Sequence, residues 1–315
     1  MTQVAEVQGD TNRHDRYPTR IAAEPSMLQR SEPAVWGRPA HGPFDSSALA
    51  GHESRGFTII DNFLNASEVM SCREELDRLS RDPAMRDSGR VICERGTDEV
   101  RSVFDVHRRG DVVAELIRDG RILDRARQLL GSDVYIHQSR INSMPGFKGT
   151  GFYWHSDFET WHAEDGLPVP RAVSCSITLT ENYPFNGSLM VMPGSHKRFV
   201  QCVGATPDDN YTSSLVSQEV GVPRREDVTR MAAEFGIDQF TGAAGTALWF
   251  DSNVMHGSGN NITPYPRSNL FLVFNSVENT LVEPFAAARP RPEYIASRDF
   301  TPQSRREWQG VLRHA

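Results

Sequence analysis

The sequence lacks the features that define several common classes of protein. It has no apolar run of roughly 18 residues, the length that a membrane-spanning helix needs, so no membrane span is expected. Its first residues contain no apolar segment of the kind that a secretory signal requires, and the expected compartment is therefore the cytoplasm. Lys and Arg form no cluster and the net charge is -7 at pH 7. Nucleic acid is therefore not expected as a partner, because phosphate binding needs clustered positive charge.

Cysteine is also scarce. The four cysteines lie far apart in the sequence, with no CxxC pair and no zinc-ribbon spacing. For a cytoplasmic chain this pattern predicts free thiols. The composition that remains, 38% hydrophobic and 24% charged over 315 residues, is typical of a globular protein and fits one large β-rich domain.

The chain divides into an arm and a domain. Residues 1–54 are polar, rich in Pro, Arg, Ser and Ala, and without sustained periodicity. They predict an extended or partly disordered arm, which could wrap the domain or a second subunit. The domain is predicted over residues 55–315, and residues 207–240 interrupt its strand pattern as a helical or loop insertion.

Within the domain, helices precede most of the strands. Asn65, with Glu68 three residues later, resembles a capping box at the start of a helix, and a second helical stretch is expected over 111–130. Apolar stretches bounded by turn signals predict strands at 57–60, 133–143, 151–158, 172–179, 188–192, 246–251 and 268–275. The fold class is α+β, with the strands in a sandwich or barrel.

Three residues form a candidate metal site. His155 and Asp157 lie in a predicted strand, where residues two apart face the same way and can reach one ion. His256 follows another apolar strand. Two imidazoles and one carboxylate are the facial triad of non-haem iron(II) oxygenases, which keep the other coordination positions for a 2-oxo acid and O₂. A His-x-Asp pair or a single histidine is, taken alone, more often an ordinary polar site.

Arg267 strengthens the metal hypothesis. If residues 260–266 close a hairpin, Arg267 returns beside His256 on the neighbouring strand, where its guanidinium could hold the distal carboxylate of 2-oxoglutarate. Strand parity then places Asn269 and Phe271 on the same face, and Ser258 could donate to the same carboxylate. The alternatives are an exposed strand-end charge for Arg267, core packing for Phe271 and a turn hydrogen bond for Ser258.

Longer motifs carry a resemblance to a known family. The string FYWHSDFETWHAEDG at 152–166 and its continuation to 199 resemble the ectoine hydroxylases, a branch of the phytanoyl-CoA hydroxylase-like iron(II)/2-oxoglutarate dioxygenases. The likeness continues through WFDSNVMHGSGNNITPYPRSNLFLVFNSVEN at 249–279 and covers nearly everything after residue 55. The long HSDFETWHxEDG string is far more specific than the bare triad, which would fit many dioxygenases.

The resemblance implies a double-stranded β-helix (jelly-roll) core flanked by helices. It implies iron(II) as cofactor, with 2-oxoglutarate and O₂ as co-substrates, for the hydroxylation of ectoine to 5-hydroxyectoine. By position in the family motif, the residues implied for 2-oxoglutarate are Asn142, Phe152, Ser258 and Arg267. Those implied for ectoine are Gln138, Trp161, Ser174, Phe250, Asn269 and Phe271.

Two positions do not follow the simplest form of this scheme. Phe152 precedes His155 by three residues, so both can face the site only if a bend or bulge lies between them. Met144 stands where many relatives have lysine, and Lys148 is a candidate replacement. Ectoine, a zwitterion with a delocalised cation, suits aromatic faces such as that of Trp161.

Two other functions compete with ectoine hydroxylation. One is a dioxygenase of the same group that acts on another small substrate, such as proline. The other is a non-catalytic binding protein that keeps the fold, although the intact triad argues against it. The long arm and the resemblance favour a homodimer.

Overall fold

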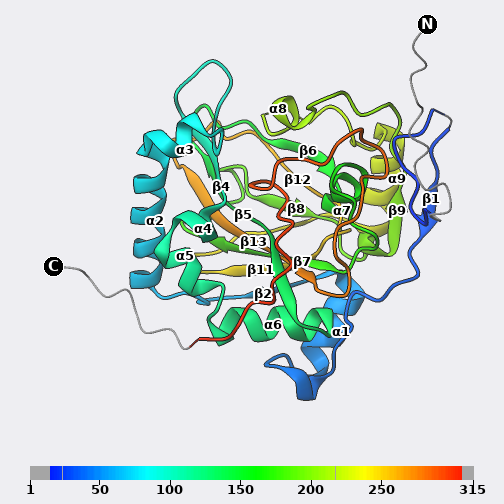
Figure 1. The fold of residues 1–315 in the computed structure, drawn as a ribbon, viewed down its shortest axis with the longest axis horizontal. Coiled ribbons are helices and arrows are strands. Elements are labelled where there is room, and N and C mark those ends of the chain that lie inside the picture. The colour runs from blue at the N-terminus through cyan, green and yellow to red at the C-terminus, as the bar shows by residue number, and fades with distance from the viewer. Residues whose placement is uncertain (1–14, 23, 217, 307–315) are drawn as a thin grey trace, which may run out of the picture.

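The computed structural model describes residues 15–22, 24–216 and 218–306. Strands occupy its centre and helices surround them (Figure 1). The larger sheet has seven antiparallel strands in the order β2-β11-β7-β13-β5-β4-β3. Their bounds are Phe57–Ile60, Ala247–Asp251, Ala172–Thr178, Arg267–Ser276, Val134–Met144, Val100–Phe104 and Val91–Cys93.

A second sheet has four strands in the order β10-β8-β12-β6. Their bounds are Asp238–Gln239, Leu189–Val191, His256–Ser258 and Phe152–His155. The two sheets pack through a shared apolar cluster, in which Leu189 and Val191 of β8 meet Phe250 of β11 and Phe271 of β13. A separate two-stranded sheet pairs β1, Met27–Gln29, with β9, Arg198–Val200.

Helices cover the outer face of the seven-stranded sheet. The main core joins apolar residues of α2, α5 and α6 to the residues of β5, β7, β11 and β13 that face these helices. Trp249 is fully buried among them. Burying this apolar area is what holds the helices on the sheet. The helices are α1 Ser46–Arg55, α2 Ala66–Arg81, α3 Pro83–Asp87, α4 Val106–Arg109, α5 Asp111–Leu116, α6 Gly120–Leu130, α7 Asp157–Thr160, α8 Tyr211–Ser214 and α9 Arg225–Phe235.

Several local predictions are confirmed. Asn65 and Glu68 form the predicted capping box at the start of α2, and each predicted strand region contains a strand. All four cysteines are free thiols. The stretch predicted as one helix over 111–130 is instead two helices, because the extended backbone of Asp119 ends the first and its carboxylate accepts the backbone N–H of Arg121 to cap the second.

The hairpin that was expected to place Arg267 beside His256 does not form. The strand of His256, β12, pairs with β6 and β8, whereas the strand of Arg267, β13, pairs with β5 and β7. The segment between them crosses from one sheet to the other. Arg267 and His256 therefore line the same pocket from different sheets.

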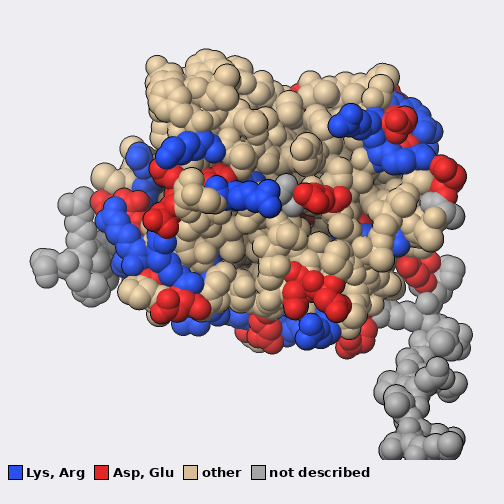
Figure 2. Space-filling view, turned by 90° about the horizontal axis from the view of Figure 1, so that it is seen from above, with Lys and Arg blue, Asp and Glu red and all other residues tan. Residues whose placement is uncertain are grey.

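The described part of the predicted arm is packed on the domain. β1 lies on β9, α1 packs beside β2 at residues 46–55, and Tyr17 and Arg20 are buried. Residues 1–14 lie outside the described part of the chain. The predicted insertion contains α8 and α9. On the face of the molecule seen in Figure 2, acidic and basic side chains are interspersed. Among the described residues, no helix is long and apolar enough to cross a membrane.

Candidate metal centre

The triad is assembled by two paired strands and one helical turn. His155 and His256 are direct cross-strand partners in the antiparallel pair β6–β12, where facing side chains approach closely. Asp157 was predicted to lie on the strand. It lies instead at the first position of α7. Ser156 between them keeps an extended backbone, with φ -109° and ψ 129°, so Asp157 still points to the side of His155.

The three side chains leave room for one ion between them. One ligand atom from each residue can be chosen so that all lie within 4.8 Å of one another. The Nε2 atoms of His155 and His256 lie 3.7 and 3.9 Å from the two carboxylate oxygens of Asp157. The Nδ1 atoms face backbone carbonyls, that of Tyr153 at 2.7 Å and that of Val254 at 2.9 Å. Since a carbonyl only accepts, Nδ1 carries the proton and Nε2 is left for a metal.

The electrostatics favour the ligand forms of these groups. Burial alone would raise the pKa of the Asp157 carboxyl, but the His256 and His155 imidazoles hold that pKa well below its usual range. Burial, and then the neighbouring His155, lower the pKa of His256 to about 4. At neutral pH the site therefore offers a carboxylate and a neutral imidazole at His256, the forms that bind a divalent metal.

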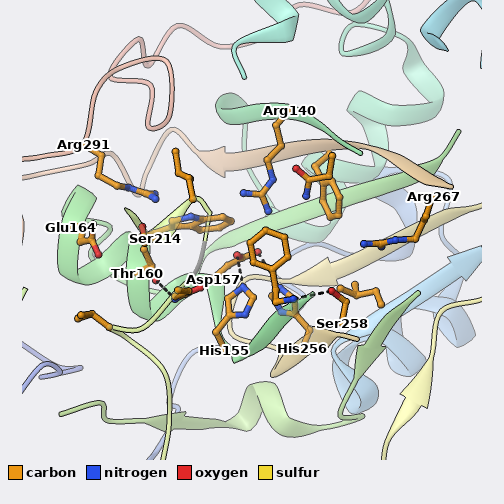
Figure 3. A pocket seen from close by; sticks show the side chains of 18 residues that line it. Arg140, His155, Asp157, Thr160, Glu164, Ser214, His256, Ser258, Arg267 and Arg291 are labelled. Atoms are coloured by element: carbon orange, nitrogen blue, oxygen red, sulfur yellow. Dashed lines mark hydrogen bonds and ion pairs between the residues drawn. The ribbon is translucent and has the colours of Figure 1, made fainter. Parts of the chain in front are cut away.

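A pocket opens beside the triad and extends to either side of it. In Figure 3 Arg267 lies at one end, Glu164 and Arg291 lie at the other, and the triad lies between them. The remaining lining residues are Arg140, Asn142, Phe152, Thr160, Trp161, Leu189, Ser214, Leu215, Gln218, Val220, Ser258 and Phe271. Ser214, Leu215, Gln218 and Val220 belong to the predicted insertion, which therefore forms part of the pocket wall.

Arg267 is a buried cation without a counter-charge. It is 6% exposed, its Nε makes no hydrogen bond, and its Nη2 lies 4.0 Å from the sulfur of Met144. Among the described residues, no carboxylate lies within ion-pair distance of it. Burial, and then the nearby Arg101, lower the pKa of Arg267 to about 10, so the guanidinium is still charged at neutral pH. A buried guanidinium of this kind needs an anion, and a ligand in the pocket could supply it.

Most of the predicted site residues meet in this pocket. Besides the triad and Arg267, the pocket is lined by Asn142, Phe152, Trp161, Ser258 and Phe271. The bulge expected near Phe152 is confirmed: Ser258 pairs with Phe152 and His256 with His155, so one strand has an extra residue. Lys148 does not replace the lysine expected at Met144, because its Nζ lies at the surface, 3.5 Å from Glu99.

Four of the residues implied for ectoine do not line the pocket. Gln138 donates to the backbone carbonyl of Ile295 at 2.7 Å, and Asn269 donates to Ser176 at 3.2 Å. Ser174 is fully buried in β7, and the Phe250 ring lies edge-on to His256 with a centroid distance of 5.2 Å.

Three charged lining residues were not predicted. Arg140 could have been found by parity, since it lies between Gln138 and Asn142 on one face of β5. Glu164 lies in the motif string but no spacing rule singles it out. Arg291 lies in a segment without periodicity. Its side chain donates two hydrogen bonds to Asp165, at 2.8 and 2.6 Å. No local signal could have placed Arg291 in the site.

Comparison with known proteins agrees with this geometry. The family model described as phytanoyl-CoA dioxygenase matches residues 52–269. The chain belongs to the phytanoyl-CoA dioxygenase family. An ectoine dioxygenase from Nocardia farcinica is 62% identical over 96% of this chain and 100% of its own length, and one from Streptomyces coelicolor is 59% identical over 93% and 98%.

Solved structures confirm the predicted fold. The structure of EctD from S. alaskensis with 2-oxoglutarate and 5-hydroxyectoine is 42% identical, covers 93% of this chain and 98% of its own, and superposes with a TM-score of 0.84. The carbocyclase SnoK, at 18% identity and a TM-score of 0.62 over 84% of this chain, shares the fold alone. The core of this family member is therefore the double-stranded β-helix, with the triad between its two sheets.

Proposed function

We propose that this chain is an iron(II)- and 2-oxoglutarate-dependent dioxygenase that hydroxylates ectoine to 5-hydroxyectoine. The observation that carries the proposal is one pocket that joins a buried His-Asp-His triad to a buried, unpaired arginine. The triad suits a metal that must keep coordination positions open. The arginine suits the distal carboxylate of a dicarboxylic 2-oxo acid. The names of the ectoine dioxygenases and the ligands of EctD support the choice of substrate.

The far end of the pocket has the chemistry of a zwitterion site. Ectoine has a carboxylate and a delocalised amidinium on a small ring. Arg140 and Arg291 offer cations to the carboxylate, Glu164 offers an anion to the amidinium, and the ring of Trp161 offers a flat apolar wall. A free amino acid such as proline has the same charges but no planar cation to lie on an aromatic face.

The residues of the chain define how such a reaction would be arranged. Iron(II) held by His155, Asp157 and His256 would supply the oxidising chemistry that couples O₂ and 2-oxoglutarate decarboxylation to hydroxylation of a C–H bond. The carbonyls of Tyr153 and Val254 fix the two imidazole rings by accepting from Nδ1. Arg267 would hold the tail of 2-oxoglutarate so that its oxo-acid end faces the triad. The three triad side chains are buried, which limits the access of bulk water to the reacting groups.

Mass spectrometry of ectoine incubated with the protein, iron(II), ascorbate and 2-oxoglutarate tests the proposal. We expect a product heavier by one oxygen and an equal amount of succinate. A parallel reaction with proline separates the two substrate hypotheses. Succinate formation coupled to proline, with none coupled to ectoine, would reject ectoine as the substrate. No turnover with either compound, in a protein that retains iron, would favour the non-catalytic alternative.

The homodimer and the cytoplasmic location stay predictions. The described arm residues pack on their own domain. Light scattering on the purified protein measures the oligomeric state directly.

A further inference from the structure

A buried ionic cluster joins three distant segments of the chain next to the pocket. Arg20, from the arm, makes two hydrogen bonds to Glu159 at 2.8 and 3.0 Å, and its Nη2 lies 3.0 Å from Oε1 of Glu164. The insertion contributes Asn210, whose side chain donates to the same Oε1 at 2.8 Å. The side chains of Arg20, Glu159 and Glu164 are each at most 3% exposed. Two buried carboxylates therefore share one guanidinium.

Glu164 has one oxygen left for a ligand. Its Oε1 is held by Arg20 and Asn210, whereas Oε2 has no hydrogen-bond or ion-pair partner among the described residues. Glu164 lines the pocket beside the triad, and it also lines a neighbouring hollow formed by residues 206–211 and 287–292. In Figure 3 it lies at the end of the pocket away from Arg267.

The charges at this end of the pocket leave the Glu164 carboxylate without full compensation. Arg291 is near enough to interact electrostatically with Glu164, but it already makes two hydrogen bonds with the buried carboxylate of Asp165. Arg20 is shared with Glu159. A buried carboxylate is costly unless it is paired, so a cationic group of a ligand in the pocket would stabilise Glu164.

We propose that Glu164 recognises the cationic amidinium of the substrate, with Oε2 accepting a hydrogen bond from a ring N–H. Arg20 and Asn210 act as positioning residues, because both hold the other oxygen of the same carboxylate. This inference rests on the proposed function, since it requires ectoine, or a substrate with the same charges, in the pocket. It gives the arm and the insertion a shared role in substrate selection.

The variant E164Q tests the role of the charge with almost no change in shape. Because a hydrogen bond to a charged group is stronger than a neutral one, we expect the KM for ectoine to rise at least about tenfold. The KM for 2-oxoglutarate should stay unchanged, since Arg267 lies at the other end. A matched control is E75Q, which alters another buried glutamate. Glu75 accepts hydrogen bonds from the backbone N–H groups of Val112 and Val113, in a helical region that does not line the pocket. E75Q should lower thermal stability and leave both KM values alone.

Pyroglutamate is a second probe, because it is a cyclic carboxylate with a neutral ring amide. Wild-type protein should bind it far more weakly than ectoine, and E164Q should narrow that difference in affinity.

If E164Q does not fold, N210L decides the question, since it removes the donor that orients Glu164 and should raise the KM for ectoine several-fold. An unchanged ectoine KM in the folded variant overturns the role of Glu164. Absence of ectoine turnover by the wild-type protein overturns the proposed function and this inference together.

Discussion

Replacing Arg267 by methionine should stabilise the protein without ligand and remove most of its stabilisation by 2-oxoglutarate. A pKa lowered from its ordinary value to about 10 corresponds to a penalty of about 3 kcal/mol for keeping this guanidinium charged in the fold. Methionine removes the charge and keeps much of the volume, so R267M avoids that penalty. The gain in unfolding free energy should be roughly 1 to 3 kcal/mol, since replacing a buried charge with an apolar side chain is often stabilising.

2-Oxoglutarate should stabilise the variant much less than it stabilises the wild-type protein. A pair of charge-assisted hydrogen bonds contributes about 3 kcal/mol, so its loss weakens 2-oxoglutarate binding by roughly 100-fold. At a concentration 100 times the wild-type Kd, the ligand stabilises wild-type protein by about 2.7 kcal/mol but the variant by only about 0.4 kcal/mol. Chemical denaturation under nitrogen, with iron(II) and with or without 2-oxoglutarate, measures both quantities.

Arg101 provides a matched control for Arg267. It is also buried, but it forms an ion pair with Glu94 at 3.0 Å and donates to the carbonyl of Thr150 at 2.8 Å. R101M leaves Glu94 unpaired and should destabilise the protein by about 3 kcal/mol or more, with or without ligand. If R267M is destabilised in the same way, or if 2-oxoglutarate stabilises it as much as wild type, Arg267 is not an unpaired anion-binding residue.

Three other predictions concern the metal, the pH dependence of stability and the thiols. H155A removes one of the three ligands, so iron content after gel filtration and ectoine turnover should both fall to background; retention of stoichiometric iron would contradict the assigned triad. Burial, and then His196, lower the pKa of His52 to about 3, so the unfolded chain takes up a proton that the folded chain does not. The contribution of His52 to the unfolding free energy should therefore be fully present above pH 6.5 and fall by up to about 1.4 kcal/mol per pH unit below it; a slope no shallower in H52Q than in the wild-type protein would refute this. Three cysteines are buried and Cys93 is partly exposed, so a thiol reagent should label one cysteine in the native protein and four in denaturant.

Local periodicity predicted the elements well, and it failed where a neighbouring strand or cap changed the backbone. A register shift between Val273 and Phe274 shows that β5 has an extra residue near His137. After this extra residue, Arg140 and Asn142 face the pocket, and Ile141 faces the helices on the other side of the sheet. Sequence alone could require a bulge only between Phe152 and His155, because both were already assigned to the site. On β5 the residues assigned to the site were Gln138 and Asn142, which share one face of a regular strand, so the sequence did not require a bulge there.

The sequence by itself determined the family and picked out His155, Asp157 and His256 as candidate metal ligands, which the structure brings together. Those features depend on residues close together in the chain, or on motifs long enough to be specific. Only the tertiary structure decided that Arg267 reaches the triad from the opposite sheet, and that Arg20, Glu164 and Arg291 meet at the other end of the pocket. The physical reason is that periodicity fixes which face of an element a side chain occupies. Which faces meet is decided by burial of apolar area over the whole fold, and this burial brings side chains from the arm, the insertion and the C-terminal segment into one site.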